Sequence, residues 1–260
     1  MKKISIISGY SGPGGSTEAF ISLTNELNKK GYDAVFHGPN EYHLNKCKSG
    51  YFPLVSTEGV VLLHYYNIGS VINAEKIIYV SHELDWHPIT AKHERYDSVV
   101  FLHEKHREYH SEYKGKYHLI PNLKTPLIPK DPLVYMSKNI AGVIGSIEPR
   151  KQTHVSIQRA LDAGCNLVRV FGRISDAFYF NKFVSPLINE KVKIYGQFDD
   201  KQKMYDSIDC VFHSSLGEVA CLVKDECYSA NVLFYGNENT EHEVSKLTND
   251  EIINKWIELF

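Results

Sequence analysis

The sequence lacks the patterns of a membrane-spanning protein and of a disulfide-bonded scaffold. It has no run of about 18 apolar residues, the length that a membrane-spanning helix needs. Its five cysteines are an odd number, contain no CxxC pair and are too sparse for a disulfide framework. The basic start MKKISIISGY has too short an apolar stretch for a signal peptide. We therefore expect a cytoplasmic protein with reduced thiols and no transmembrane segment.

An excess of positive charge is also missing. The 260 residues include 29 Lys and Arg against 31 Asp and Glu, which gives a net charge of −2. No global field therefore draws in nucleic acid, although a local basic groove stays open. With 43% hydrophobic and 23% charged residues, the composition is that of a globular protein of one large or two small domains.

What the sequence does contain is an alternation of short β-branched runs with longer amphipathic stretches. This alternation is typical of parallel sheets covered by helices. A stretch with three prolines, 122–139, interrupts it and reads as a linker. The expected strands are 3–8, 33–37, 60–65, 76–81, 98–103 and 117–121, then 140–145, 167–172, 192–196, 209–214 and 232–236.

The alternation predicts an α/β chain of two Rossmann-like domains. We expect the first at 1–130 and the second at 131–245, with a last helix at 246–260 that can cross back to the first domain. Two such domains leave a cleft between the carboxyl ends of their strands, where ligands of open α/β sheets bind. Candidate chemistry should therefore follow directly after strands.

The glycine-rich turn GYSGPGGST, 9–17, lies between the first expected strand and helix. It matches neither the dinucleotide spacing GxGxxG nor the phosphate loop GxxxxGK[ST]. Its glycines let the backbone approach a ligand and aim a helix N-terminus at an anion, with Ser16 as the expected N-cap. The alternative is a tight turn that needs glycine for its conformation.

The segment SIEPRKQTH, 146–154, follows the first strand of the second half. Arg150 and Lys151 stand just before an expected helix, where the helix dipole does not favour cations. This placement suggests a phosphate partner, with a solvated surface pair as the alternative.

Two histidine-containing segments are weaker candidates. YVSHELDWHP places His82, Glu83, Asp85 and His87 at a strand end, but there is no GxSxG nucleophile elbow to complete a hydrolase triad. A lone His82 is more often a structural residue. HEKHREYH lacks the HExxH zinc pattern, so we expect its three histidines to lie on a solvated helix face.

Glu218 and Glu226 lie eight residues apart around a mostly apolar run. On one helix they would be about 80° out of line and about 12 Å apart along the axis. That geometry suits neither a shared proton nor a shared metal ion. The pair either holds two ends of an extended ligand or marks the ends of a core helix.

In chain order, these pieces resemble the retaining, family-4-type glycosyltransferases of the two-domain GT-B fold. GPGGSTEAFISLTNELNKKGYDAVF resembles their glycine loop and first helix, SHELDW their strand-end histidine segment, and HLIPN the turn before their second domain. GVIGSIEPRKQTHVSIQRAL resembles their EPRKG turn, and VKIYGQFDDKQKMYDSIDCVFHSSLGEVACLVKDE resembles the run up to their E-x7-E motif. The resemblance implies a compact GT-B fold with a central cleft.

The resemblance also implies residue roles. Glu226 would bind the ribose hydroxyls of a nucleotide donor, and Glu218 the donor sugar. Lys151 and Arg150 would neutralise the leaving diphosphate. The remaining implied contacts are His82 to the transferred sugar, the Gly14 and Gly15 amides to phosphate or acceptor, and Gly196 and Phe198 near the base. Ser146 and Cys221 differ from the arginine and glycine usual in the family.

The sequence therefore predicts a metal-independent retaining transferase with a nucleotide diphosphate sugar as donor and no cofactor. Its catalytic residues would be His82, Lys151 and Glu218. The acceptor is left open among a glycan, a lipid-linked sugar, a protein and a nucleic acid, and the oligomeric state is left open as well. The alternatives are an epimerase or nucleotide-sugar-binding relative of the same fold, a phage-type transferase that glycosylates nucleic acid, and a nicotinamide oxidoreductase.

Overall fold

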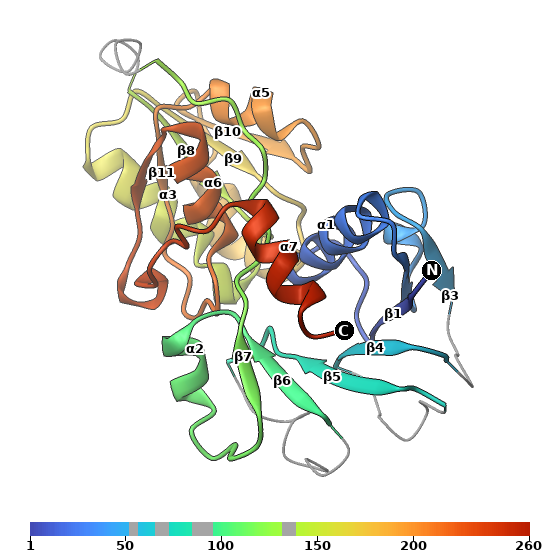
Figure 1. The fold of residues 1–260 in the computed structure, drawn as a ribbon. Coiled ribbons are helices and arrows are strands. Elements are labelled where there is room, and N and C mark those ends of the chain that lie inside the picture. The colour runs from blue at the N-terminus through green and yellow to red at the C-terminus, as the bar shows by residue number, and fades with distance from the viewer. Residues whose placement is uncertain (52–56, 66–72, 85–95, 132–138) are drawn as a thin grey trace. The chain divides into compact units, whose positions relative to one another are not determined.

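The chain forms two compact units (Figure 1). This computed structural model describes residues 1–51, 57–65, 73–84, 96–131 and 139–260. The first unit combines Met1–Leu123 with Ser245–Phe260, and the second is Lys124–Val244. Each unit carries one parallel β-sheet.

The boundary between the units lies before residue 124, whereas the sequence analysis drew it after residue 130. The physical reason is local hydrogen bonding. The Ile128 amide donates to Gln202 Oε1 at 2.8 Å, and the Lys130 amide donates to the Ala230 carbonyl at 2.9 Å. The described part of the expected linker thus contains no helix or strand and is bonded to the second unit.

The sheet of the first unit has seven parallel strands in the order β3-β2-β1-β4-β5-β6-β7. Six were predicted from sequence, and the third, the short SGY, was missed because it contains no β-branched residue. The strands are β1 (Lys3–Ser8), β2 (Asp33–Gly38), β3 (Ser49–Tyr51), β4 (Val60–His64), β5 (Lys76–Val80), β6 (Ser98–Phe101) and β7 (Tyr117–Leu119).

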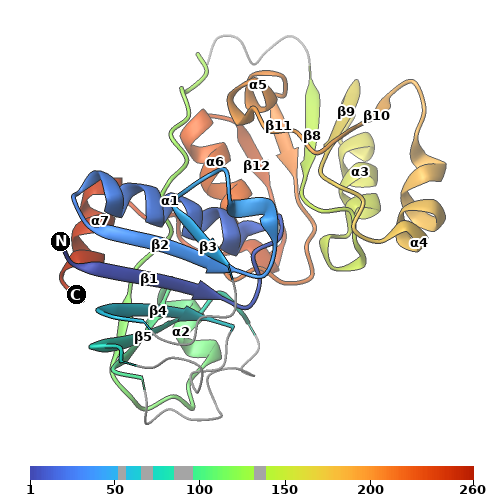
Figure 2. The same cartoon turned by 90° about the vertical axis from the view of Figure 1, so that its right-hand side faces the viewer.

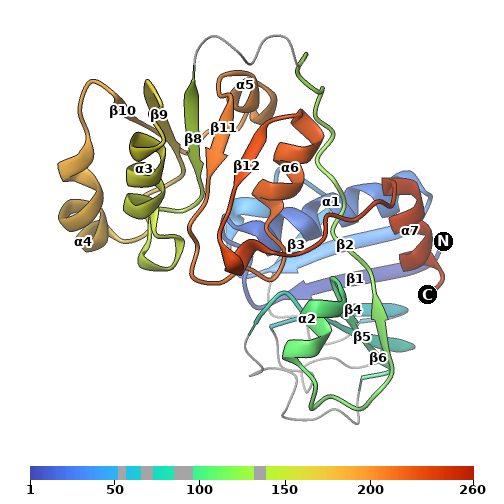
Figure 3. The same cartoon turned by 90° about the vertical axis from the view of Figure 1, so that its left-hand side faces the viewer.

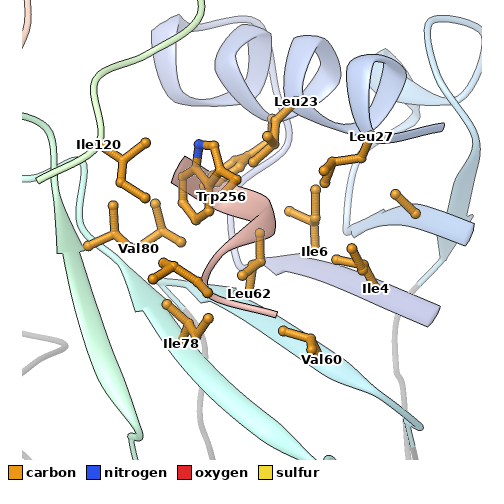
Figure 4. Packing of buried hydrophobic residues seen from close by; sticks show 14 of the residues in the cluster. Ile4, Ile6, Leu23, Leu27, Val60, Leu62, Ile78, Val80, Ile120 and Trp256 are labelled. Atoms are coloured by element: carbon orange, nitrogen blue, oxygen red, sulfur yellow. The ribbon is translucent and has the colours of Figure 1, made fainter. Parts of the chain in front are cut away.

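Helices α1 (Gly15–Lys29) and α7 (Asn249–Ile257) cover the main core of this sheet (Figure 4). Trp256 of α7 lies among the apolar side chains of α1 and the central strands, so the C-terminal helix completes the first unit. A Thr248–Glu251 capping box begins α7. The expected N-cap Ser16 is wrong, because Gly14 is the N-cap and α1 already begins at Gly15. Helix α2 (Glu104–Tyr109) and a 3₁₀ turn at Glu41–His43 complete the unit.

The sheet of the second unit has five parallel strands in the order β10-β9-β8-β11-β12 (Figure 2). They are β8 (Ile140–Ile144), β9 (Leu167–Phe171), β10 (Val192–Gly196), β11 (Cys210–Phe212) and β12 (Leu233–Tyr235). All five were predicted from sequence.

Helices cover both faces of this second sheet (Figure 3). On one face α3 (Thr153–Asp162) packs with the run of α4 (Ala177–Tyr179) and the π-helix Phe180–Val184. On the other face lie α5 (Lys201–Asp206) and α6 (Leu222–Ala230). Short 3₁₀ turns complete the unit at Pro149–Lys151, Ser185–Leu187 and Glu238–Thr240.

Each sheet reverses its strand order at one place. In the first unit the reversal lies between β1 and β4, and in the second it lies between β8 and β11. Ligands of open α/β sheets bind outside the carboxyl ends of the strands at such a switch point. The residues that directly follow these four strands are therefore the first place to look for a functional site.

Candidate functional site

At the switch point of the second unit, two cations lie beside one carboxylate. Arg150 and Lys151 belong to the 3₁₀ turn after β8, and Glu218 follows β11. Lys151 Nζ forms an ion pair with Glu218 Oε1, and Arg150 Nη1 lies 3.9 Å from the same oxygen. Arg150 is exposed and also donates to the carbonyl oxygen of Gly217 at 3.0 Å. The fold thus brings together three residues that the sequence analysis had singled out separately.

His213, which the sequence analysis did not single out, is a further member of this cluster. Its Nε2 lies 3.0 Å from Glu218 Oε1, and its side chain is buried. Burial alone would raise the pKa of Glu218, but the hydrogen bond with His213 and the charge of Lys151 outweigh it and lower the pKa to about 2. Glu218 is therefore a carboxylate at any physiological pH. The signal in the sequence was a polar residue directly after the strand CVF.

The run from Glu218 to Glu226 is not one helix. Helix α6 begins at Leu222, with Cys221 as its N-cap, so Glu218 lies in the irregular segment before the helix. The separation of about 12 Å expected for a continuous helix therefore does not apply. Cys221 has φ −76°, a backbone conformation open to any residue, and its buried thiol has a pKa raised to about 12 by desolvation.

Glu226 is buried within α6 and is held by three side chains. Its Oε1 accepts hydrogen bonds from Thr125 Oγ1 at 3.0 Å and Lys201 Nζ at 2.5 Å. Its Oε2 accepts one from the Tyr205 hydroxyl at 2.8 Å. The sequence predicted the position of this carboxylate after β11 but none of its partners.

Gly196 and Phe198 lie at the edge strand β10, two strands away from the β8–β11 switch point. Gly196 ends β10 with φ +67°, a conformation that favours glycine. The ring of Phe171 stacks on exposed Tyr195 with a centroid distance of 5.1 Å and meets Phe198 edge-on at 5.6 Å. This edge therefore offers aromatic surface.

At the switch point of the first unit, the glycine turn leads from β1 into α1. Gly14 and Gly15 are exposed, and no side chain caps the N-terminus of the helix. The Tyr10 hydroxyl donates to the Pro13 carbonyl at 3.0 Å, and its ring lies against Gly14. The first-turn amides are thus left without a side-chain acceptor.

His82 follows β5 and is half-buried. Its ring lies 5.0 Å from that of Phe20 and 5.4 Å from that of His64, centroid to centroid. Burial and the charge of His64 lower the pKa of His82 to about 3. Glu83 pairs with His64, so the carboxylate beside His82 has a partner. Asp85 and His87 fall outside the described residues.

The expected solvated histidine face of HEKHREYH is wrong for two of its three histidines. His106 and His110 are buried, and the Nε2 atom of each lies within hydrogen-bond distance of the Glu83 carbonyl, at 3.0 and 2.9 Å. His103 instead caps α2 by accepting from the His106 amide. Within the described ranges, no group of three or more His, Cys, Asp or Glu could hold a metal ion.

Two further expectations concern membranes and cysteines. Among the helices within the described residues, none is long and apolar enough to cross a membrane. All five cysteines are free thiols, four of them buried.

Comparisons with known proteins identify the fold. No family model matches the chain, and no curated protein matches it either. Among solved structures, Anabaena HepE in complex with UDP-glucose has a TM-score of 0.72 and 13% identity over 99% of this chain and 90% of that chain. A glycosyltransferase from Rickettsia africae ESF-5 has a TM-score of 0.71 and 11% identity over 91% and 79%.

A third similar structure is WaaG, a glycosyltransferase involved in lipopolysaccharide biosynthesis. Its TM-score is 0.64 and its identity 12%, over 96% of this chain and 88% of that chain. All three likenesses extend over both units and rest on structure rather than sequence. Together with the two parallel sheets, they show that the chain has the GT-B fold.

Proposed function

We propose that the protein is a glycosyltransferase that moves a sugar from a nucleotide diphosphate sugar to an acceptor hydroxyl with retention of anomeric configuration. The observation that carries the proposal is the cluster of Lys151, Arg150 and Glu218 at the β8–β11 switch point. A UDP-sugar is the first donor to test, because a structural neighbour of the same fold was solved with UDP-glucose.

Lys151 and Arg150 would stabilise the diphosphate as it leaves. The lysine ammonium has three donors, so Lys151 can keep Glu218 and still contact a phosphate oxygen. Arg150 is exposed and offers a planar fork that matches phosphate oxygens. Because negative charge on the diphosphate grows as the glycosidic bond breaks, these cations would stabilise the transition state more than the ground state.

Glu218 would accept hydrogen bonds from hydroxyls of the donor sugar. With its pKa lowered to about 2 by His213 and Lys151 against the opposing effect of burial, it stays ionised and cannot donate a proton near neutral pH. An epimerase would need a carboxylate or histidine poised to exchange protons at the sugar. The ionised Glu218 therefore favours a transferase over the epimerase alternative.

Glu226 would bind the ribose of the donor. A carboxylate has about four lone-pair positions, and Thr125, Lys201 and Tyr205 occupy three of them. The remaining position on Oε2 can accept one ribose hydroxyl, and Lys201 can donate to a second. The aromatic surface of Tyr195 and Phe198 would lie on the side of the base.

The reaction needs no protein nucleophile in this account. The bond between the anomeric carbon and the diphosphate oxygen breaks, and the acceptor hydroxyl oxygen bonds to that carbon on the same face. The acceptor proton passes to the departing phosphate oxygen. Because the cations of the protein would neutralise the diphosphate, we propose that the transfer does not require a metal ion, and equal rates with and without a chelator would support this.

The experiment that tests the proposal is a screen of UDP-, GDP-, ADP- and CMP-sugars by thermal shift, followed by transfer assays with the stabilising donor. Ligand at about 100 times its Kd stabilises the folded state by about 2.7 kcal/mol, so one nucleotide should stand out. Incubation of that donor without acceptor separates a transferase from an epimerase. Anomeric configuration is then read from the product by NMR, and an inverted product would overturn the retaining mechanism.

A further inference from the structure

A chain of short hydrogen bonds crosses the switch point of the first unit. Ser8 ends β1, His64 ends β4, and Glu83 follows β5. The Ser8 hydroxyl oxygen lies 2.7 Å from His64 Nδ1, and His64 Nε2 lies 2.6 Å from Glu83 Oε1. Ser8 and His64 are buried, with exposed fractions of 0% and 2%. None of these contacts has a role in the donor site proposed above.

The proton on the Nδ1 atom of His64 follows from the bonds of Ser8. Its hydroxyl carries one proton, and the Tyr10 carbonyl 2.5 Å away can only accept it. The Tyr10 amide also donates to the Ser8 oxygen, at 3.1 Å. Because the serine proton is already used, the contact with Nδ1 is a hydrogen bond only if His64 Nδ1 carries a proton.

The proton on the Nε2 atom of His64 follows from the bonds of Glu83. Burial would raise the pKa of Glu83, but its hydrogen bond with His64 contributes to lowering it below the ordinary value. Its second oxygen accepts the backbone amide of His82 at 3.1 Å. An ionised carboxylate only accepts, so His64 Nε2 must donate to it.

We propose that His64 is a buried imidazolium, paired with Glu83, that acts as a positioning residue for His82 and for the glycine turn. This inference rests on the proposed function together with the contact of His82 with the transferred sugar that the family resemblance implies. The desolvation cost of a buried charged pair can be offset here because each of its hydrogen-bonding atoms has a partner.

The pair fixes the position of His82 through Glu83. The Glu83 side chain accepts the His82 amide, while the Glu83 carbonyl is bonded to His106. The His106 Nδ1 atom accepts the amide of Leu102, so its Nε2 is the protonated atom that donates to Glu83. The side chain and the backbone carbonyl of Glu83 are thus both held by hydrogen bonds.

His82 is neutral because it is half-buried beside His64. Burial and the nearby charge of His64 lower the pKa of His82 to about 3. Within the described residues, no hydrogen bond is made by the His82 ring nitrogens. A neutral imidazole offers one donor and one acceptor, which is the combination that a sugar hydroxyl can use in either direction.

The glycine turn is bonded to the backbone of His64. The Gly9 amide donates to the His64 carbonyl at 3.0 Å. A Cβ on Gly9 would come within 2.0 Å of the Tyr65 carbonyl oxygen, so only glycine permits this approach. Ser8 precedes the turn directly and is held by the His64 ring.

The titratable groups around His64 come from several elements. Glu83 and His82 face it from the segment after β5, and Tyr65 follows it at the end of β4. Helix α2 contributes His106 and His110 at the Glu83 carbonyl. Among these groups, Glu83 is the only carboxylate, so the charge on His64 depends on it.

The test is NMR of the full chain labelled with ¹⁵N-histidine, with the His64 signals identified by their loss in His64→Gln. At about pH 7, both ring nitrogens of His64 should carry protons. In the Glu83→Gln variant, His64 should carry only one of these two ring protons at the same pH. A His64 with one unprotonated nitrogen in the wild-type chain at about pH 7 would overturn the charge assignment.

The positioning role needs a kinetic readout as well. Glu83→Gln should lower kcat about 10- to 100-fold while the KM for the donor changes by less than about 2-fold, because the proposed donor contacts lie in the second unit. Glu58→Gln removes an exposed carboxylate of the same unit and should leave both unchanged. Ser8→Ala provides a milder variant that removes the Nδ1 acceptor and should lower kcat in the same way.

The two proposals fail in different ways. A doubly protonated His64 in a chain that transfers no sugar from any donor would overturn the proposed function and leave the charge assignment standing. Normal kcat in both Glu83→Gln and Ser8→Ala would overturn the positioning role while transfer itself persists.

Discussion

The two switch points of this protein have the same topology, but the side chains at each differ in charge and hydrogen-bonding character. In both units a turn leads from the first strand into a helix, and a second group follows the strand across the reversal. The first unit places a glycine turn and His64 there, with neutral His82 beside His64 after β5, whereas the second unit places Arg150, Lys151 and ionised Glu218 there. The difference suggests a division of labour in which the second unit handles charge and the first handles hydroxyl groups.

Among the changes that test this difference between the units, removal of Lys151 should lower kcat the most. Loss of one charge-stabilising donor typically costs about 100- to 1000-fold in kcat, and we expect Lys151→Ala to fall in that range. Steady-state transfer assays measure it, and Lys193→Ala, which removes an exposed lysine of the same unit, should be near normal. Near-normal transfer by Lys151→Ala would contradict the assignment of this cluster as the diphosphate site.

Acid should affect the two units over different pH ranges. In the first unit burial lowers the pKa of His82 and His106 to about 3 and of His37 to about 4, so the unfolded state binds more protons below about pH 6.5. Stability from these histidines is present above that pH and is lost as the pH falls below it. In the second unit the stability from Glu218, with its pKa of about 2, is lost only below about pH 4.5.

The sequence supplies a probe for this difference, because both tryptophans, Trp86 and Trp256, belong to the first unit. Tryptophan fluorescence should therefore change at a higher pH than the last part of the far-ultraviolet circular dichroism signal. One coincident transition for both signals would contradict the prediction.

Glu226→Gln should have a smaller effect, confined to binding of the nucleotide. The amide keeps an acceptor for Lys201 but loses the negative charge that holds Thr125, Lys201 and Tyr205 together. We expect the donor Kd to rise about 10-fold, or about 1.4 kcal/mol, with kcat changed less. Calorimetry with the donor measures this, and unchanged affinity would remove Glu226 from the donor site.

Cys221→Ala should have the smallest effect. The thiol is buried and neutral at working pH because burial raises its pKa to about 12, and its backbone conformation does not require glycine. Transfer should stay within about 2-fold of wild type, with a loss of unfolding free energy of about 1 kcal/mol. A large fall in kcat without unfolding would show that the sulfur takes part in function.

Most of the architecture could be predicted from sequence because most of the parallel strands are short apolar runs rich in β-branched residues, and several of them are followed by a helix such as α1, α3 or α6. The three-residue β3 was missed because it has no such pattern, and it forms only because β2 pairs with it. Ser16 was a reasonable N-cap by residue type, but the chain enters α1 through Gly14 instead.

The positions of the candidate site residues could be predicted from the sequence, but the side chains that contact them could not. Arg150 and Lys151 could be found because they lie in the turn between β8 and α3, and Glu218 because of its spacing to Glu226 after β11. The partners of Glu226 come from Thr125, Lys201 and Tyr205, and only tertiary packing brings these together. The same holds for buried His106 and His110, since a polar helix of six residues gives no sign that the Glu83 carbonyl lies beneath it.

The most direct test of the central claim is calorimetric titration of wild-type protein and Lys151→Ala with UDP and with uridine, or with the matching pair for whichever nucleotide the donor screen selects. If the β8–β11 cluster binds the diphosphate, wild type should prefer the diphosphate by about 100-fold or more, and Lys151→Ala should lose most of that preference while binding the nucleoside as before. Equal preference in both proteins would contradict the account.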